Sequence, residues 1–150
     1  MNLSKNLTLA EVTRSNTAKR LGINNEPTKE HLDSLKELAV SVFQPIRDHF
    51  NSPIYISSGY RSEELNKAIK GSSSSQHCKG EAIDIDMDGT NISNRKIFDF
   101  IKDNLEFDQL IFEFGTKENP DWVHVSYAKT NRREVLRAER INNRVVYSEY

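Results

Sequence analysis

The segment Ser75-Gln76-His77-Cys78-Lys79-Gly80-Glu81-Ala82-Ile83-Asp84 is the most informative stretch of this chain. It leaves a serine-rich loop and enters residues 81–87, where apolar residues alternate with polar or small ones, a pattern that predicts a β-strand. His77 lies at the end of the loop, and Asp84 falls on the polar face of the strand. Imidazole and carboxylate groups together suit a hydrolytic metal. A surface histidine followed by a solvated aspartate is the other interpretation, and this segment alone leaves both open.

A second motif is Asp121-Trp122-Val123-His124-Val125-Ser126-Tyr127. Strand alternation places Trp122, His124 and Ser126 on one face and the valines on the core face. Asp121 precedes this strand, where it could reach a water at a metal. A lone strand histidine is more often held by an ordinary hydrogen bond, so this motif is also ambiguous when taken alone.

A third motif, Ser57-Ser58-Gly59-Tyr60-Arg61-Ser62, combines a strand end, a tight turn and an arginine before a helix. The Arg61 guanidinium can bind a carboxylate or a developing oxyanion through paired donors. Neutralising a nearby acidic residue is the structural alternative.

The three motifs gain meaning if they converge. His77, Asp84 and His124 would then provide three protein ligands to zinc and leave a fourth position for water, as in catalytic zinc sites. Asp121 would accept a proton from the attacking water and return it to the leaving amine, and Arg61 would help to stabilise the oxyanion.

The combined pattern resembles the zinc D-Ala-D-Ala carboxypeptidase family. The residues that match are Ser75-x-His77-x-x-Gly80-x-Ala82-x-Asp84, preceded by Ser58-Gly59-Tyr60-Arg61-Ser62 and followed by Asp121-x-x-His124. That family includes D-alanyl-D-alanine carboxypeptidases and dipeptidases and L-alanyl-D-glutamate endopeptidases, which cut peptidoglycan stem peptides. The likeness extends over about residues 7 to 127. Within the family, the chain is similar to the short single-domain members of bacteria and phages.

The resemblance implies a role for each matching residue. It makes His77, Asp84 and His124 the zinc ligands, Asp121 the general base and Arg61 the oxyanion- or substrate-binding group. Many relatives have Glu at the position of Asp121. Further candidates for substrate binding are Ser75, Gln76 and Trp122. The resemblance also implies the fold shared with the hedgehog signalling domain, a small antiparallel sheet flanked by helices.

Composition limits the classes of protein that the chain can represent. Its 150 residues predict one domain, residues 1–150, with a single core. The net charge of −1 argues against a broad nucleic-acid-binding surface, and no apolar run is long enough to span a membrane. The single cysteine, Cys78, excludes an internal disulfide. We expect a monomer.

The hydrophobic pattern predicts an α+β fold with a mostly antiparallel sheet. The expected helices begin at Thr8, after Ser15, at Thr28, at Ser62 and at Ser93. The helix from Thr28 follows an apolar pattern to Phe50, and Pro45 should kink it or end it early. The expected strands cover residues 53–57, 81–87, 108–114 and 122–127, followed by a hairpin of 134–141 and 144–150 across Asn142-Asn143.

Three functions are consistent with these observations. The first is zinc-dependent hydrolysis of a peptide bond in peptidoglycan. The second is an inactive zinc-containing module of the same fold that binds a wall peptide or a protein, and the third is a structural phage protein with a vestigial site. The N-terminus lacks the pattern of a signal peptide. We therefore expect synthesis in the cytoplasm and action on the cell wall. A phage protein could be released by a holin or carried in the phage particle, and a bacterial origin is equally consistent with the sequence.

Overall fold

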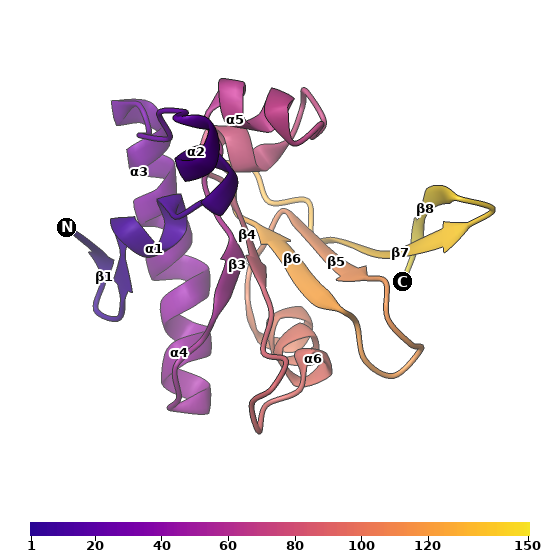
Figure 1. Cartoon of the computed structure of the whole chain (residues 1–150). Helices are drawn as coiled ribbons and strands as arrows, with labels where there is room; N and C mark the ends of the chain where they lie inside the picture. The colour runs from indigo at the N-terminus through magenta and orange to yellow at the C-terminus, as the bar shows by residue number, and fades with distance from the viewer.

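A six-stranded sheet, whose strands all follow residue 55, forms the centre of the molecule, and helices pack around it. The computed structural model describes all residues from Met1 to Tyr150 (Figure 1). The helical elements are α1 (Leu9–Thr13), α2 (Asn16–Leu21), α3 (Lys29–Leu38), η1 (Ala39–Phe43), α4 (Gln44–Phe50), α5 (Glu63–Ala68), η2 (Gln76–Lys79) and α6 (Asn94–Asn104). The strands are β1 (Asn2–Ser4), β2 (Leu7–Thr8), β3 (Ile56–Ser58), β4 (Ala82–Ile85), β5 (Gln109–Glu113), β6 (Trp122–Ser126), β7 (Glu134–Ile141) and β8 (Arg144–Glu149). The predicted α+β class is confirmed.

The large sheet has the strand order β3-β4-β6-β5-β7-β8. Its neighbouring strands are antiparallel except for the β5–β7 pair, which is parallel. The predicted antiparallel character therefore holds for most of a mixed sheet. The small β1–β2 sheet was not predicted, because two strands of three and two residues are too short to show alternation.

The two faces of the central strands differ in chemistry, and this difference positions the site. One face contributes fully buried residues to a core cluster of 23 residues, namely Ile83, Ile85, Leu110, Phe112, Val123 and Val125. The residues that alternate with them line a cavity on the other face, namely Asp84, Ile111, Glu113 and His124. The period of two along each strand separates the core from the cavity.

The predicted helix from Thr28 to Phe50 is continuous but changes its winding in the middle. Residues 39–43 form the π-helical segment η1, in which the backbone N–H of Gln44 donates to the carbonyl of Ala39. Pro45 lacks an N–H, and its ring would clash with the carbonyl four residues earlier in a regular α-helix. The wider π turn accommodates this proline, so the helix does not end early, and the irregularity at Pro45 takes the form of a change of helix type.

The predicted strand 53–57 is wrong in its first half, because β3 begins at Ile56. Pro53 cannot donate to a ladder, and the N–H of Tyr55 lies 3.4 Å from the sulfur of Met87. Ile56 is the first residue in register with β4, opposite Ile85.

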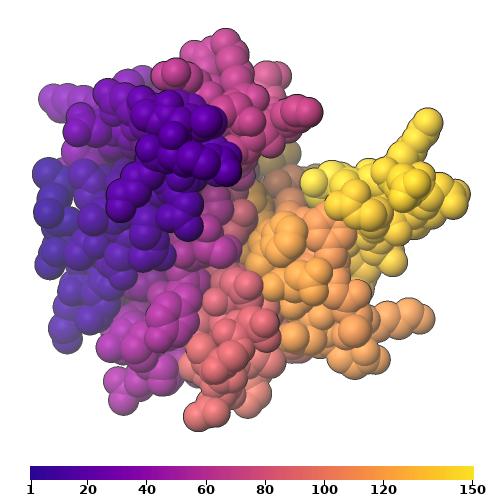
Figure 2. All heavy atoms as spheres, in the orientation of Figure 1, coloured from indigo at the N-terminus to yellow at the C-terminus, as the bar shows by residue number.

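The C-terminal strands β7 and β8 form the predicted hairpin. Asn142 and Asn143 have φ angles of 51° and 63°, the left-handed conformation that a type I′ turn requires. Figure 2 shows the hairpin in yellow, projecting from the body of the molecule beyond β5 and β6. No helix combines the length and the apolar composition needed to cross a membrane.

Candidate metal centre and its cavity

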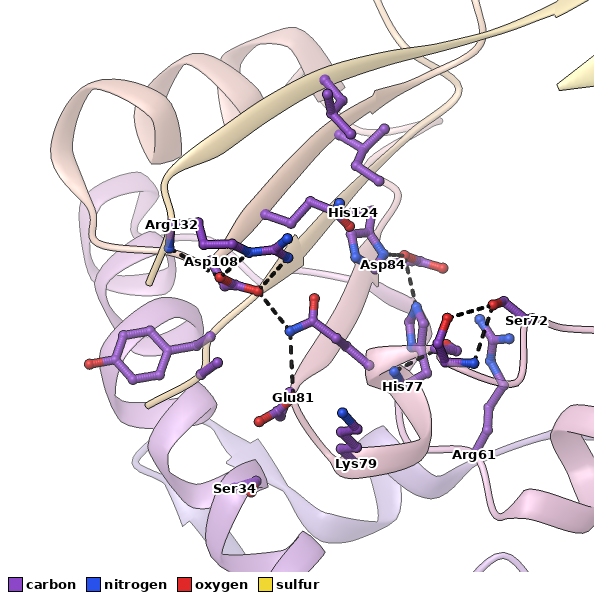
Figure 3. Close-up of a pocket in the computed structure, with 18 of the residues that line it drawn as sticks. Ser34, Arg61, Ser72, His77, Lys79, Glu81, Asp84, Asp108, His124 and Arg132 are labelled. Carbon is purple, nitrogen blue, oxygen red and sulfur yellow. Dashed lines mark hydrogen bonds and ion pairs between the residues drawn. The ribbon is translucent and has the colours of Figure 1, made fainter. Parts of the chain in front are cut away.

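Two neighbouring strands and a short helix bring the three predicted ligands together. Asp84 on β4 is in register with His124 on β6, and Asp84 Oδ1 lies 3.0 Å from His124 Nδ1. The same carboxylate oxygen lies 3.3 Å from His77 Nε2. One ligand atom from each residue falls within 4.8 Å of the others, and Figure 3 shows the three side chains facing one another.

Hydrogen bonds to Ser75 and Gly59 fix the orientation of His77. It lies in the 3₁₀ helix η2, where Ser75 Oγ accepts a hydrogen bond from the His77 backbone N–H at 3.2 Å. The sequence places His77 at the end of a loop, and in the structure this end of the loop is a short 3₁₀ helix. His77 Nδ1 lies 2.7 Å from the carbonyl of Gly59, which fixes the proton on Nδ1 and leaves Nε2 as an acceptor.

Gly80 ends η2 and allows the chain to turn into β4. Its φ is 73°, and a Cβ atom there would lie 2.4 Å from the carbonyl oxygen of His31 on α3. The small residue in the motif thus serves close backbone packing against a helix.

The electrostatics of the ligand group favour a deprotonated Asp84. Burial alone would raise the pKa of this carboxyl, but the charge of His77 and the hydrogen bonds from His124 and His77 outweigh burial. Together they hold the pKa of Asp84 below its usual range. An ionised carboxylate beside two imidazoles is the form that a metal ion needs.

The donor set and its spacing fit zinc. Ligand atoms of a tetrahedral zinc ion with bonds of about 2.0–2.1 Å lie about 3.3 Å apart. The Asp84–His124 and Asp84–His77 distances of 3.0 and 3.3 Å match that spacing. Two imidazoles and one carboxylate are a common set for catalytic zinc, and the Gly59 carbonyl behind His77 is the usual type of outer partner.

Arg61 also lines this cavity, and its guanidinium has a hydrogen-bond donor without a partner. Its Nη1 donates to Asn66 Oδ1 at 3.1 Å, while its buried Nε has no hydrogen-bond partner. The backbone N–H of Arg61 donates to the carbonyl of His77 at 3.1 Å, which ties the arginine to the metal-ligand segment. This guanidinium can therefore still bind an anionic oxygen.

The other predicted substrate-binding residues also line the cavity, although two of them already have partners. Gln76 donates to Asp108 Oδ2 at 2.9 Å, and Ser75 caps η2. Trp122 precedes His124 by two residues on β6, and its ring lies 5.3 Å from that of Phe114.

Asp121 is placed differently. It immediately precedes β6, its side chain is exposed, and it is not among the residues that line the cavity. Its backbone N–H donates to the carbonyl of Glu113 at 2.9 Å.

Glu113 is a cavity carboxyl that was not predicted from the sequence. It is 7% exposed, and burial raises its pKa to about 7, an effect that His124 opposes and Asp84 reinforces. The alternation of Gln109, Ile111 and Glu113 could have placed it on the cavity face. The missing information was that β5 pairs with β6 beside His124.

A second unpredicted feature is the ion pair between Asp108 and Arg132. Arg132 Nε and Nη2 donate to the two Asp108 carboxylate oxygens, each at 2.8 Å (Figure 3). Hydrogen bonds from Arg132, opposed by burial and aided by Gln76, lower the pKa of Asp108 to about 2. The pair connects the start of the C-terminal segment to Gln76 and therefore to η2.

Comparison with known families agrees with this geometry. The family model described as Peptidase M15 matches residues 5–126, which include His77, Asp84 and His124. No curated protein sequence matches the chain closely enough to count as a relative. Because the match covers most of the chain, the protein belongs to the peptidase M15 family, whose members are zinc-dependent metallopeptidases.

Proposed function

We propose that this protein hydrolyses a peptide bond in peptidoglycan stem peptides in a zinc-dependent reaction. The observation that supports it most strongly is the convergence of His77, Asp84 and His124 at zinc-ligand spacing in a cavity that also contains Arg61. A family of metallopeptidases implies a peptide substrate. The choice of peptidoglycan comes from the motifs that resemble the D-Ala-D-Ala carboxypeptidases.

When bound, zinc would lower the pKa of a water and polarise the scissile carbonyl. The residues of this chain provide the remaining steps. His77 presents Nε2 because Gly59 holds the proton on Nδ1, and Asp84 supplies the negative charge that balances the ion. Arg61 is assigned to the carbonyl oxygen as negative charge develops there, because its Nε donor has no other partner.

Asp121 is assigned as the general base by its place three residues before His124. Its exposed side chain must turn toward the cavity to accept a proton from the attacking water. Asp121→Asn should lower kcat/KM on purified peptidoglycan by about 100-fold or more while zinc content stays unchanged. Full activity in this variant would remove Asp121 from the mechanism.

The proposed function also implies the partners and the location of the protein. The protein is proposed to act as a monomer on cell-wall peptide, without nucleic acid and without insertion into a membrane. It is proposed to be made in the cytoplasm and to act on the cell wall. In a phage it would reach the wall by release through a holin or by carriage in the particle, and a bacterial origin is the alternative.

A second candidate function is a zinc-containing module that binds a wall peptide or a protein without cutting it. The observation that favours it is the exposure of Asp121 outside the cavity, since a binding module needs no general base. Zinc-dependent binding to purified cell wall without any released peptide would support this function.

Peptide release decides between the two functions. Purified peptidoglycan would be incubated with the wild-type protein, with His77→Ala and with the matched control His49→Ala, and released peptides would be identified by mass spectrometry. His49 is an exposed histidine that stacks on Phe100 away from the cavity. Hydrolysis is expected for wild type and His49→Ala, loss for His77→Ala, and reversible loss on removing zinc. No release by zinc-loaded wild type would contradict the enzymatic function.

A further inference from the structure

Glu113 is a cavity carboxyl that has no hydrogen-bond or ion-pair partner within the protein. Its side chain is buried and lines the metal cavity. No hydrogen bond or ion pair within the protein reaches its carboxylate. Burial and the negative charge of Asp84 raise its pKa, and His124 lowers it. The chain supplies no cation to this carboxyl, so a cationic group of a bound ligand would stabilise its ionised form.

Strand register places two aromatic residues on the strands to either side of Glu113. On one side it is opposite Trp122 of β6, and on the other it is opposite Ala138 of β7, which in turn is opposite Tyr147 of β8. Ala138 is small and buried, and Glu113 and Tyr147 on either side of it both line the cavity. Partial burial raises the pKa of Tyr147, and the nearby carboxylates of Glu113 and Asp84 raise it further.

Phe114 completes the group through an unusual backbone conformation. In a regular strand the residue after Glu113 would point to the opposite face. Phe114 instead has a φ of 57°, which interrupts the alternation, and it lines the cavity with its ring 5.3 Å from that of Trp122. Arg140 places its guanidinium 5.5 Å from the Phe114 centroid but forms no ion pair with Glu113.

The C-terminal hairpin therefore forms one wall of the cavity. Leu136, Val145 and Tyr147 of β7 and β8 line it together with the metal ligands. These strands lie beyond residue 126, where the family match ends. The wall is thus built from residues outside the family match.

We propose that Glu113, with Phe114, Trp122 and Tyr147, forms a subsite for a positively charged amine of the peptide substrate, such as the side chain of a lysine or another diamino acid. An ammonium group among aromatic faces gains cation–π attraction, and a buried carboxylate gives it a charge-assisted hydrogen bond. This inference rests on the proposed peptidase function, because it names the substrate feature that the same cavity selects.

The test uses two synthetic stem peptides that differ only in lysine against norleucine. Wild type should cleave the lysine peptide with a kcat/KM about 10- to 100-fold higher, the value of one buried charge-assisted contact. Glu113→Gln should lose this preference and cleave the norleucine peptide within about twofold of wild type, with zinc content unchanged. Tyr147→Leu should reduce the preference by a few-fold. Glu149→Gln, an exposed carboxyl on the same hairpin, is the matched control and should behave as wild type.

Two results would overturn the subsite. One is wild type that cleaves both peptides equally well, and the other is a Glu113→Gln variant that loses activity on both peptides to the same extent. The second result would mean that Glu113 acts on the reaction itself.

Direct binding separates this inference from the proposed function. If zinc-loaded wild type cleaves neither peptide, the proposed function fails, and calorimetry then decides the subsite. Tighter binding of the lysine peptide by wild type but not by Glu113→Gln would sustain it, and equal binding of both peptides would overturn it.

Discussion

At the residue scale, Gly80 links the metal site to the helical layer. Gly80→Ala should lower the free energy of unfolding by about 2–4 kcal/mol, because the new Cβ meets the His31 carbonyl and a left-handed backbone is itself unfavourable. Gly22→Ala is the matched control, since Gly22 has a φ of 66° but no atom within 4 Å of an added Cβ. It should lose about 1–2 kcal/mol, the backbone cost alone. Equal losses in urea unfolding would contradict the close packing at Gly80.

Asp108 provides a residue-scale prediction that depends on pH. Its folded pKa of about 2 lies below the ordinary value of about 3.9, so the unfolded chain binds more protons and the pair stabilises the fold above about pH 4. That stabilisation, about 2–3 kcal/mol, is lost as pH falls from about 4 toward 2. Asp108→Asn should therefore be less stable than wild type at pH 7, and the difference should shrink toward pH 2. A difference that stays constant over this range would contradict the ion pair.

At the element scale, Asn94 at the start of α6 connects three segments. Its side-chain oxygen accepts from the Met87 backbone N–H at 2.7 Å, and its amide donates to the carbonyls of Pro120 and Asp121 at 3.2 and 2.9 Å. Asn94→Ala leaves buried backbone groups without partners and should cost about 2–4 kcal/mol of stability, measured by thermal or urea unfolding. It should also increase hydrogen exchange of residues 114–121. Unchanged exchange there would show that Asn94 does not hold the segment that contains Asp121.

The elements most accessible to sequence analysis were those with a strong period or cap. Alternation identified β4 and β6, Ser93 marked the start of α6, and Asn142-Asn143 marked the hairpin turn. The sequence did not reveal that η2 is helical, because a single 3₁₀ turn has no hydrophobic period. The start of β3 was misplaced, since Ile54 and Tyr55 resemble strand residues until the pairing with β4 is known.

The candidate site divides in the same way. His77, Asp84 and His124 were predicted from spacing and resemblance, and the fold brings them together. Glu113 and the wall of β7 and β8 were not predicted, because they reach the cavity through the order of strands in the sheet, which no local pattern records. Asp121 is assigned from its spacing to His124, and the fold leaves its side chain exposed.

At the scale of the whole molecule, the three ligands belong to segments that meet only in the folded chain. Zinc should therefore stabilise the native state by about 2.7 kcal/mol at a free concentration 100 times its Kd. For 150 residues this corresponds to a rise in Tm of about 5–10 °C, measurable by calorimetry. Asp84→Asn should show little or no rise. An equal rise in this variant would indicate that zinc binds elsewhere.

The central claim is that His77, Asp84 and His124 form a zinc site, and metal content tests it most directly. Protein purified without chelators would be analysed by mass spectrometry for wild type, His77→Ala and the control His49→Ala. We predict about one zinc ion per chain in wild type and His49→Ala, and loss of zinc in His77→Ala. Wild type that holds no zinc even after zinc is added back, or a His77→Ala variant that keeps it, would contradict the account.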